Sequence, residues 1–395
     1  MQPITLNELD NLSNRASTVI NRLRDRVFSP GTEKSLDIRF NVRSAAEMVG
    51  RSEKLIRDAE GDGRLPEPVK DPVTNRRTGY SLAEVNTMRS VFGTLPHRAP
   101  EDPATVLAVQ NFKGGVGKST VVCHLAQYFA LKGYRVCVID CDSQGSTTSI
   151  FGLNPDVDVQ EDEDTLYPFF RHGGPKTLHY ALRATYWPGI ALIPSNLGLY
   201  DAEYEFAARI VREQGFILHR LREGIATISD QFDIILLDPP PALGMISLSV
   251  LRAANALLIP APPNNIDFGS TAHFLKMMGS TLAELAEHGG AREYSFVKIL
   301  TTKMNDNKSA HQAIKRMMDA VFPQDMLQSI LKDSAEIDNA TANLSTVYEL
   351  TGAATRSETH KRCRTYLDAV GREVELLVRK TWPSHHADLR KEGIL

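Results

Sequence analysis

The stretch VLAVQNFKGGVGKSTVVCHLAQYFAL (residues 106–131) contains three segments of different character. It opens with a short apolar run of strand type, continues through a glycine-rich loop and ends in a helical pattern. Glycines in such a loop let consecutive backbone N–H groups turn toward one anion, and the start of a helix adds a favourable potential. The stretch therefore predicts a phosphate-binding loop between a strand and a helix.

Two polar residues of this loop are predicted to have different roles in nucleotide binding. Lys118 is placed to reach the β- and γ-phosphates of a nucleotide, and the Ser119 hydroxyl is suited to Mg²⁺. The loop departs from the strict GxxxxGK[ST] pattern, because Phe112 stands where the first glycine is usual. A glycine-rich turn without a ligand is the alternative, and the flanking strand and helix argue against it. The expected nucleotide-binding residues are Lys113, Gly114, Gly115, Val116, Gly117, Lys118, Ser119 and Thr120.

Two other apolar runs end in aspartate. The run VCVIDCD ends with Asp140 and Asp142, and IILLD ends with Asp238. Ligands of open α/β sheets bind at the carboxyl ends of the strands, so we expect these carboxylates near the phosphate loop. Carboxylates there suit hydrolysis of a nucleoside triphosphate, which needs a positioned water and Mg²⁺. Ordinary capping at a strand end is the alternative for each aspartate taken alone.

Together the three motifs resemble the ParA/MinD branch of P-loop ATPases. KGGVGKS is similar to the deviant Walker A signature of that branch, DCDSQ to its second motif and IILLDPPP to its Walker B strand. The resemblance implies ATP hydrolysis, with ATP and Mg²⁺ as cofactors. It also implies that Lys113 crosses a homodimer to the phosphates of the partner and that Asp142 orients the attacking water. A solvent-facing lysine is the alternative for Lys113.

The resemblance also implies the remaining site residues. The catalytic residues are Lys113, Lys118 and Asp142, the metal is held at Ser119, Asp140 and Asp238, and Pro262 and Pro263 lie beside the adenine. The resemblance to this branch covers nearly the whole chain, including LKDSAE at residues 331–336. The block 167–205 resembles the RepA partition ATPases of RepABC plasmids, which predicts a large, plasmid-type protein of this family.

Six short apolar runs alternate with longer helical patterns. Short buried strands separated by helices favour a parallel sheet covered on both faces. The runs are residues 106–109, 136–139, 190–193, 234–237, 256–259 and 296–300. The predicted fold class is α/β, with a doubly wound, mostly parallel P-loop ATPase domain over 101–395 and an N-terminal all-α winged helix-turn-helix domain. Three prolines within 94–104 indicate the boundary.

The N-terminal part is predicted to bind DNA. A short helix ends at Gly50, and Ser52 then caps a second helix that carries Lys54 and Arg57 outward, the arrangement of a helix-turn-helix. Arg76 and Arg77 lie in a predicted wing, and this run resembles MerR-like winged helices. The winged domain is expected over 36–100, with a dimerisation helix within 1–35. A plain helical hairpin is the alternative.

The predicted function is ATP-driven DNA partition. By the resemblance, ATP closes a homodimer that binds non-specific DNA, a ParB-type centromere-binding protein stimulates hydrolysis, and the N-terminal domain binds operator DNA and represses its own operon. Non-specific contacts are expected from basic side chains, each of which could equally be a solvated surface charge. They are Lys315, Arg316, Arg362 and Arg364.

The alternative function is a MinD-like positioning ATPase on a membrane, which needs a terminal amphipathic anchor. A helical stripe near the end of the chain is formed by Tyr366, Val370, Val374 and Leu377. A polar tail follows it, so core packing is favoured and no membrane contact is expected.

Composition agrees with this class. The 395 residues are 42% hydrophobic and 24% charged, which is typical of soluble globular proteins, and no run of 18 apolar residues is present. Residues 1–100 carry 16 Lys and Arg against 13 Asp and Glu, and the rest carries 29 against 35, so a basic front end precedes an acidic body. The four cysteines lack CxxC spacing, which excludes a typical zinc site. A cytoplasmic, nucleoid-associated protein is expected.

Overall fold

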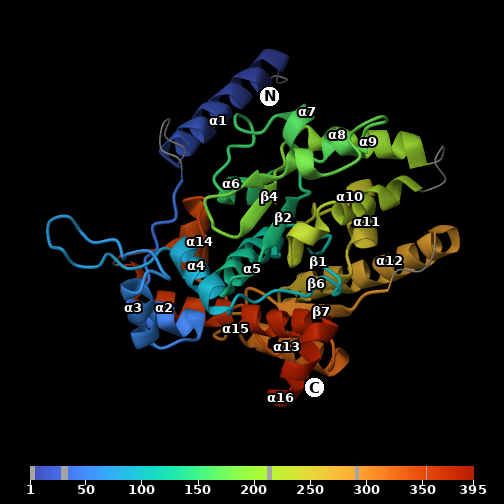
Figure 1. Cartoon of the computed structure of the whole chain (residues 1–395). Helices are drawn as coiled ribbons and strands as arrows, with labels where there is room; N and C mark the ends of the chain where they lie inside the picture. The colour runs from blue at the N-terminus through green and yellow to red at the C-terminus, as the bar shows by residue number, and fades with distance from the viewer. Residues whose placement is uncertain (1–4, 28–33, 211–215, 290–292, 353) are drawn as a thin grey trace.

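The computed structural model describes residues 5–27, 34–210, 216–289, 293–352 and 354–395 (Figure 1). The predicted N-terminal region therefore falls partly outside the described residues, at 1–4 and 28–33. The strands are β1 (Thr105–Val109), β2 (Val136–Asp140), β3 (Arg183–Ala184), β4 (Ile190–Ile193), β5 (Ile234–Asp238), β6 (Ala256–Ala261) and β7 (Phe296–Thr301). The helices are α1 (Leu6–Val27), α2 (Val42–Val49), α3 (Glu53–Gly61), α4 (Leu82–Phe92), α5 (Lys118–Lys132), α6 (Ser146–Ile150), α7 (Glu161–Asp164), α8 (Tyr167–Phe170), α9 (Leu199–Ile210), α10 (Arg220–Ala226), α11 (Met245–Ala253), α12 (Asn265–Gly289), α13 (Ser309–Val321), α14 (Ala335–Ala342), α15 (Glu358–Lys380) and α16 (His386–Lys391).

The strands form one twisted sheet in the order β3-β4-β2-β5-β1-β6-β7. All neighbours are parallel except β3, a two-residue strand that pairs antiparallel with β4 and that the apolar pattern did not predict. Alternate strand residues enter two separate cores, one on each face. Helices α5 and α15 cover one face, and α9 to α12 cover the other (Figure 1). The predicted α/β fold class is confirmed.

The N-terminal helices form a small domain on a core of its own. Asn41 caps α2, Ser52 caps α3, and Gly50 ends α2 with φ 67, so the two helices meet through a short turn. A hairpin-like wing follows α3 and is joined by an isolated bridge between Lys70 and Arg77. The winged helix-turn-helix that the sequence predicts for these residues stays a prediction.

The N-terminal domain packs on the sheet domain through α4. Leu82 belongs to the core between α5 and the sheet. Arg89 is 2% exposed and donates to the carbonyl oxygens of Leu131, at 2.6 Å, and Met48, at 3.3 Å. Leu131 lies in the last turn of α5, where carbonyl groups lack helical partners and a cation is favourable. The guanidinium of Arg89 therefore joins the small domain to the helix that follows the phosphate loop.

His124 gives α5 a pH-sensitive contact in the core. Its Nδ1 lies 2.7 Å from the Thr120 carbonyl oxygen, and its Nε2 accepts from the Val347 N–H at 3.3 Å, so both nitrogens suit a neutral ring. Burial lowers the pKa of His124 to about 4. The unfolded chain, with a pKa near 6.5, binds this proton more readily, so His124 stabilises the fold fully above about pH 6.5 and loses that contribution as the pH falls toward 4.

We therefore predict a pH-dependent loss of stability that His124→Gln removes. Between pH 7 and pH 4 the parent chain should lose about 3 kcal/mol of unfolding free energy more than the variant, since 2.303RT is about 1.36 kcal/mol per pKa unit. Urea unfolding at several pH values measures the difference. Parallel pH profiles for the two chains would show that His124 is not the titrating group.

Candidate functional site

The glycine-rich loop leaves an open space in front of its backbone. It joins the end of β1 to the start of α5, as the sequence predicted. Gly115 and Gly117 have φ of 76° and 98°, conformations that a side chain disfavours. A Cβ atom at either position would meet nothing within 4 Å, so crowding is not the reason for glycine there. The loop therefore presents its backbone toward free space, as anion binding requires.

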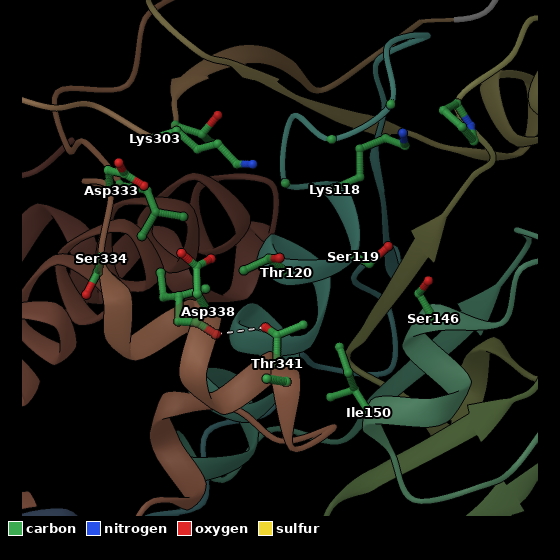
Figure 2. Close-up of a pocket in the computed structure, with 18 of the residues that line it drawn as sticks. Lys118, Ser119, Thr120, Ser146, Ile150, Lys303, Asp333, Ser334, Asp338 and Thr341 are labelled. Carbon is green, nitrogen blue, oxygen red and sulfur yellow. Dashed lines mark hydrogen bonds between the residues drawn. The ribbon is translucent and has the colours of Figure 1, made fainter. Parts of the chain in front are cut away.

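A cavity of about 560 Å³ lies in front of this loop (Figure 2). The predicted residues that line it are Gly114, Gly115, Gly117, Lys118, Ser119, Thr120 and Asp142. Val116 does not line it, because it is buried and its carbonyl oxygen accepts from the Thr302 hydroxyl. Pro262 and Pro263, predicted beside the adenine, are also absent from its lining.

Sequence reasoning missed the wall opposite the loop. That wall follows β7 and includes α14, and Figure 2 shows it facing Lys118 and Ser119 across the cavity. Its residues include Thr302, Lys303, Lys332, Asp333, Ser334, Ile337, Asp338 and Thr341. Lys303 has φ of 52°, an uncommon conformation for a residue other than glycine. The LKDSAE stretch was the one sequence signal here, and it gave no individual roles.

Lys118 is buried at the edge of the cavity. Its side chain belongs to a residue that is 7% exposed, and its Nζ lies 3.4 Å from the Lys113 carbonyl oxygen. Burial lowers the pKa of Lys118, while the carboxylates of Asp238 and Asp142 act in the opposite direction. A buried ammonium facing an open space is suited to an anionic ligand.

Asp140 and Asp238 stand side by side at the ends of β2 and β5, which pair in register at these residues. Both are buried. Burial raises the pKa of Asp140 well above its ordinary value, and the Asp238 carboxylate raises it further. Burial also raises the pKa of Asp238 to about 6, against hydrogen bonds from Thr147 and Ser119. Two buried carboxylates on neighbouring strands favour a cation beside them.

The donor set at these carboxylates fits Mg²⁺. Asp140 accepts from the Thr148 N–H and hydroxyl, and Asp238 Oδ2 accepts from the Thr147 hydroxyl at 2.7 Å. Asp238 Oδ1 is buried and has no hydrogen-bond partner among the described residues. No cluster of three or more His, Cys, Asp or Glu side chains forms a metal cage in the described part of the chain. A few oxygen ligands completed by water and phosphate are what Mg²⁺ commonly uses.

Lys113 lies away from the cavity lining. Its Nζ forms an ion pair with Asp267 near the start of α12, and its side chain is 31% exposed. Asp267 also accepts from the Asn264 side-chain amide, and its N–H donates to Asn264 Oδ1 at 3.0 Å. In the single chain, therefore, Lys113 is held by a residue 154 positions away in the sequence.

The expected DNA-contacting residues of the winged domain have different surroundings. Ser52 Oγ accepts from the Leu55 N–H and so caps α3, and Arg57 pairs with Glu53 on the same helix. Lys54 and Arg76 are exposed. Arg77 donates to Glu60 at 2.7 Å and to the Tyr80 hydroxyl at 2.8 Å, so it fastens the wing to α3.

The basic residues expected at non-specific DNA lie on α13 and α15. Arg316 and Arg362 are exposed. Lys315 forms an ion pair with Asp319 one turn along α13. Arg364 is half-buried, with its guanidinium 5.3 Å from the ring centroid of Tyr348. No helix in the described residues is long and apolar enough to cross a bilayer.

Comparison with known proteins assigns this chain to a family. An AAA domain model matches residues 104–286. SopA of Escherichia coli (strain K12) is 33% identical over 354 residues, which are 87% of this chain and 89% of SopA. A protein named putative replication protein A, from Rhizobium rhizogenes, is 30% identical over 370 residues, or 90% of each chain. A solved structure described as a partition protein covers 94% of this chain and 98% of its own, with a TM-score of 0.68 at 19% identity, which shows the shared fold. The chain belongs to the ParA family of partition-protein ATPases.

Proposed function

We propose that this protein hydrolyses ATP to ADP and phosphate in the cavity of Figure 2 and uses the ATP cycle to segregate copies of a DNA replicon. One observation carries the proposal. The phosphate loop, the buried Lys118 and Asp142 line one cavity. Asp140 and Asp238 end the two paired strands β2 and β5, and the chain is similar to SopA along most of its length.

The proposed mechanism assigns a part to each group. Backbone N–H groups of residues 114–119 and the Lys118 ammonium bind the phosphates, where their charge opposes the charge that develops in transfer. Ser119, Asp140 and Asp238 would hold Mg²⁺, which supplies charge neutralisation at the phosphate oxygens when bound. Asp142 lines the cavity and orients the attacking water.

Lys113 is the residue proposed to make the active form a dimer. It is half-exposed and faces α12 through Asp267. To act on the phosphates of a second copy it must leave Asp267, so the ion pair belongs to the single chain and is exchanged for phosphate contacts in the dimer.

The α1 helix supports self-association, because its described side chains are exposed and several are apolar. These apolar residues are Leu6, Leu9, Leu12, Val19 and Ile20.

DNA is proposed to bind in two ways. The N-terminal domain reads operator DNA through α3, with Lys54 and Arg57 directed at base edges and Ser52 and Arg76 at the backbone, and thereby represses the operon. The dimer holds non-specific nucleoid DNA through basic residues that contact phosphates. A ParB-type centromere-binding partner would stimulate hydrolysis and release this DNA. Lys315, Arg316, Arg362 and Arg364 are the proposed non-specific contacts.

The two modes predict opposite outcomes for two double variants. A Lys54→Ala/Arg57→Ala chain should lose preference for its operator by about 100-fold or more, since base contacts contribute roughly 1–3 kcal/mol each, and should keep ATP-dependent binding to random duplex. An Arg362→Ala/Arg364→Ala chain should keep operator preference and bind random duplex with a shallower salt dependence. Filter binding at several salt concentrations measures both.

The structure offers a matched control on the same recognition helix. Glu53→Gln removes the ion-pair partner of Arg57 without removing a cation, so it should not weaken either mode. Equal weakening of operator and random binding in both double variants would indicate one shared DNA surface and would contradict the division of labour.

The MinD-like alternative receives no support from α15. Val370 and Val374 of the C-terminal stripe are buried in the core beside α5, and Leu377 packs against that core. A stripe that is packed inside the protein is not available to a membrane surface. Partition on DNA therefore remains the function that the site and the relatives support best.

A further inference from the structure

Lys34 brings the N-terminal segment into contact with the ATPase domain. It lies between α1 and α2 in the sequence, far from the phosphate loop. Its Nζ donates to the carbonyl oxygens of Ile150 and Leu344, at 2.9 and 2.8 Å, and pairs with Glu349 Oε2 at 3.0 Å. We call this group the Lys34 junction: Lys34, Ile150, Leu344 and Glu349.

Two members of the junction, Ile150 and Leu344, lie at or just after the C-terminal ends of helices that line the cavity. Ile150 is the last residue of α6 and lines the cavity itself. Leu344 follows α14, whose residues Ile337 and Thr341 line the opposite wall. Figure 2 shows Ile150 and Thr341 on these two elements at the same end of the cavity. One ammonium group therefore holds together two walls that come from distant parts of the chain.

Glu349 connects the junction to a third wall. Its Oε1 accepts from the Gln127 side-chain amide at 2.9 Å, and its Oε2 accepts from the Ser345 hydroxyl at 2.8 Å. Gln127 belongs to α5, whose first residues line the phosphate end of the cavity. Lys34 thus contacts the end of α6 and the segment after α14 directly, and it reaches α5 through Glu349 and Gln127.

The junction is buried and its geometry is specific. The Lys34 and Glu349 side chains are 20% and 8% exposed, and the ammonium lies 4.7 Å from the ring centroid of Tyr186. The Tyr186 hydroxyl donates to the Ile150 carbonyl oxygen as well. Leu344 has φ of 48°, an unfavourable conformation for leucine. Removing the ammonium would leave a buried carboxylate and two carbonyl oxygens without this donor.

We propose that Lys34 is a positioning residue for the nucleotide: it fixes the spacing of α5, α6 and α14 and so sets the affinity of the cavity for ATP and ADP. The inference rests on the proposed ATPase function. Lys34 does not line the cavity, so it acts through Ile150 and α14 and not by touching the ligand. The N-terminal segment thereby takes part in the ATPase site.

The test compares Lys34→Met, Lys34→Arg and the exposed control Lys391→Met in the full chain. Lys34→Met keeps the aliphatic stem and loses the ammonium. Calorimetric Kd values for ATP and ADP should rise about tenfold, while kcat at saturating ATP stays within about twofold, because the phosphate loop is untouched. Lys34→Arg should return the Kd values to within about threefold of the parent, and Lys391→Met should match the parent.

A nucleotide-free measurement separates this inference from the proposed function. Amide hydrogen exchange of 148–153 and 340–346 should be faster in Lys34→Met than in the parent, with exchange in the winged domain unchanged. Faster exchange in a chain that binds no ATP would uphold the junction and overturn the ATPase proposal. Unchanged Kd values in Lys34→Met, with or without a lower Tm, would overturn the positioning role, as would unchanged exchange in both segments.

Discussion

Replacing Lys118 with alanine is expected to abolish ATP turnover. Lys118 is the cation of the phosphate loop that lines the cavity, and it is buried there at 7% exposure. Lys113, the other cation of the loop, is paired with Asp267 and cannot replace it in the same chain. Loss of one preorganised donor at a developing charge typically lowers rates by 10²–10³, so we expect kcat/KM to fall by about 10³-fold, with weaker ATP binding.

The same helix offers the control for this experiment. Lys132 lies in the last turn of α5, where its ammonium is 5.4 Å from the ring centroid of Tyr128, and it does not line the cavity. Lys132→Ala should leave ATP hydrolysis unchanged. Circular dichroism should show both variants folded. Burial of the Lys118 ammonium lowers its pKa and so disfavours the charged form, and replacing the side chain with alanine removes this unfavourable desolvation. Normal hydrolysis by Lys118→Ala would mean that the phosphates bind elsewhere.

The parts of the site that the sequence predicted are those set by local pattern. The run 106–109, the glycines and the helical pattern after Lys118 are adjacent in the chain, so strand, loop and helix follow from a single stretch. The neighbouring positions of Asp140 and Asp238 followed from one further rule, that ligand groups gather at the carboxyl ends of parallel strands. The two residues pair in register, and their part in holding a metal stays a prediction.

The parts that could not be predicted depend on contacts between distant segments. Asp267 meets Lys113 across 154 positions, and Lys34 meets Leu344 across 310, and no periodicity in either segment specifies its partner. The cavity wall formed by α14 likewise depends on contacts between segments that are far apart in the sequence. Arg77 shows the same limit: its contacts with Glu60 and Tyr80 were not predictable from the sequence, and its expected contact with DNA stays a prediction.

Replacing Asp142 with alanine should separate ATP binding from hydrolysis. Asp142 lines the cavity beside the phosphate loop, and its Oδ1 accepts from the Gln144 N–H at 3.0 Å, which holds the carboxylate at the end of β2. It has no expected contact with the adenosine, and the metal ligands Asp140 and Asp238 remain in the variant. Groups that position or deprotonate a nucleophile typically contribute 10²–10⁴ in rate, so we expect kcat to fall by at least about 100-fold with little change in the Kd for ATP.

The consequence for DNA distinguishes Asp142 from Lys118. A chain that binds ATP but hydrolyses it slowly should accumulate in the dimeric state and stay on random duplex DNA, whereas Lys118→Ala should never reach that state. Filter binding with ATP and single-turnover hydrolysis on the same samples would measure both steps. Because Asp142 also opposes the burial-driven lowering of the Lys118 pKa, its loss has a second possible route, through weaker phosphate binding. That route would raise the Kd for ATP together with the loss of kcat, and DNA retention would then fail.

A slow variant that still retains DNA therefore assigns the water-positioning role to Asp142, and unchanged hydrolysis would assign it to another residue of the cavity.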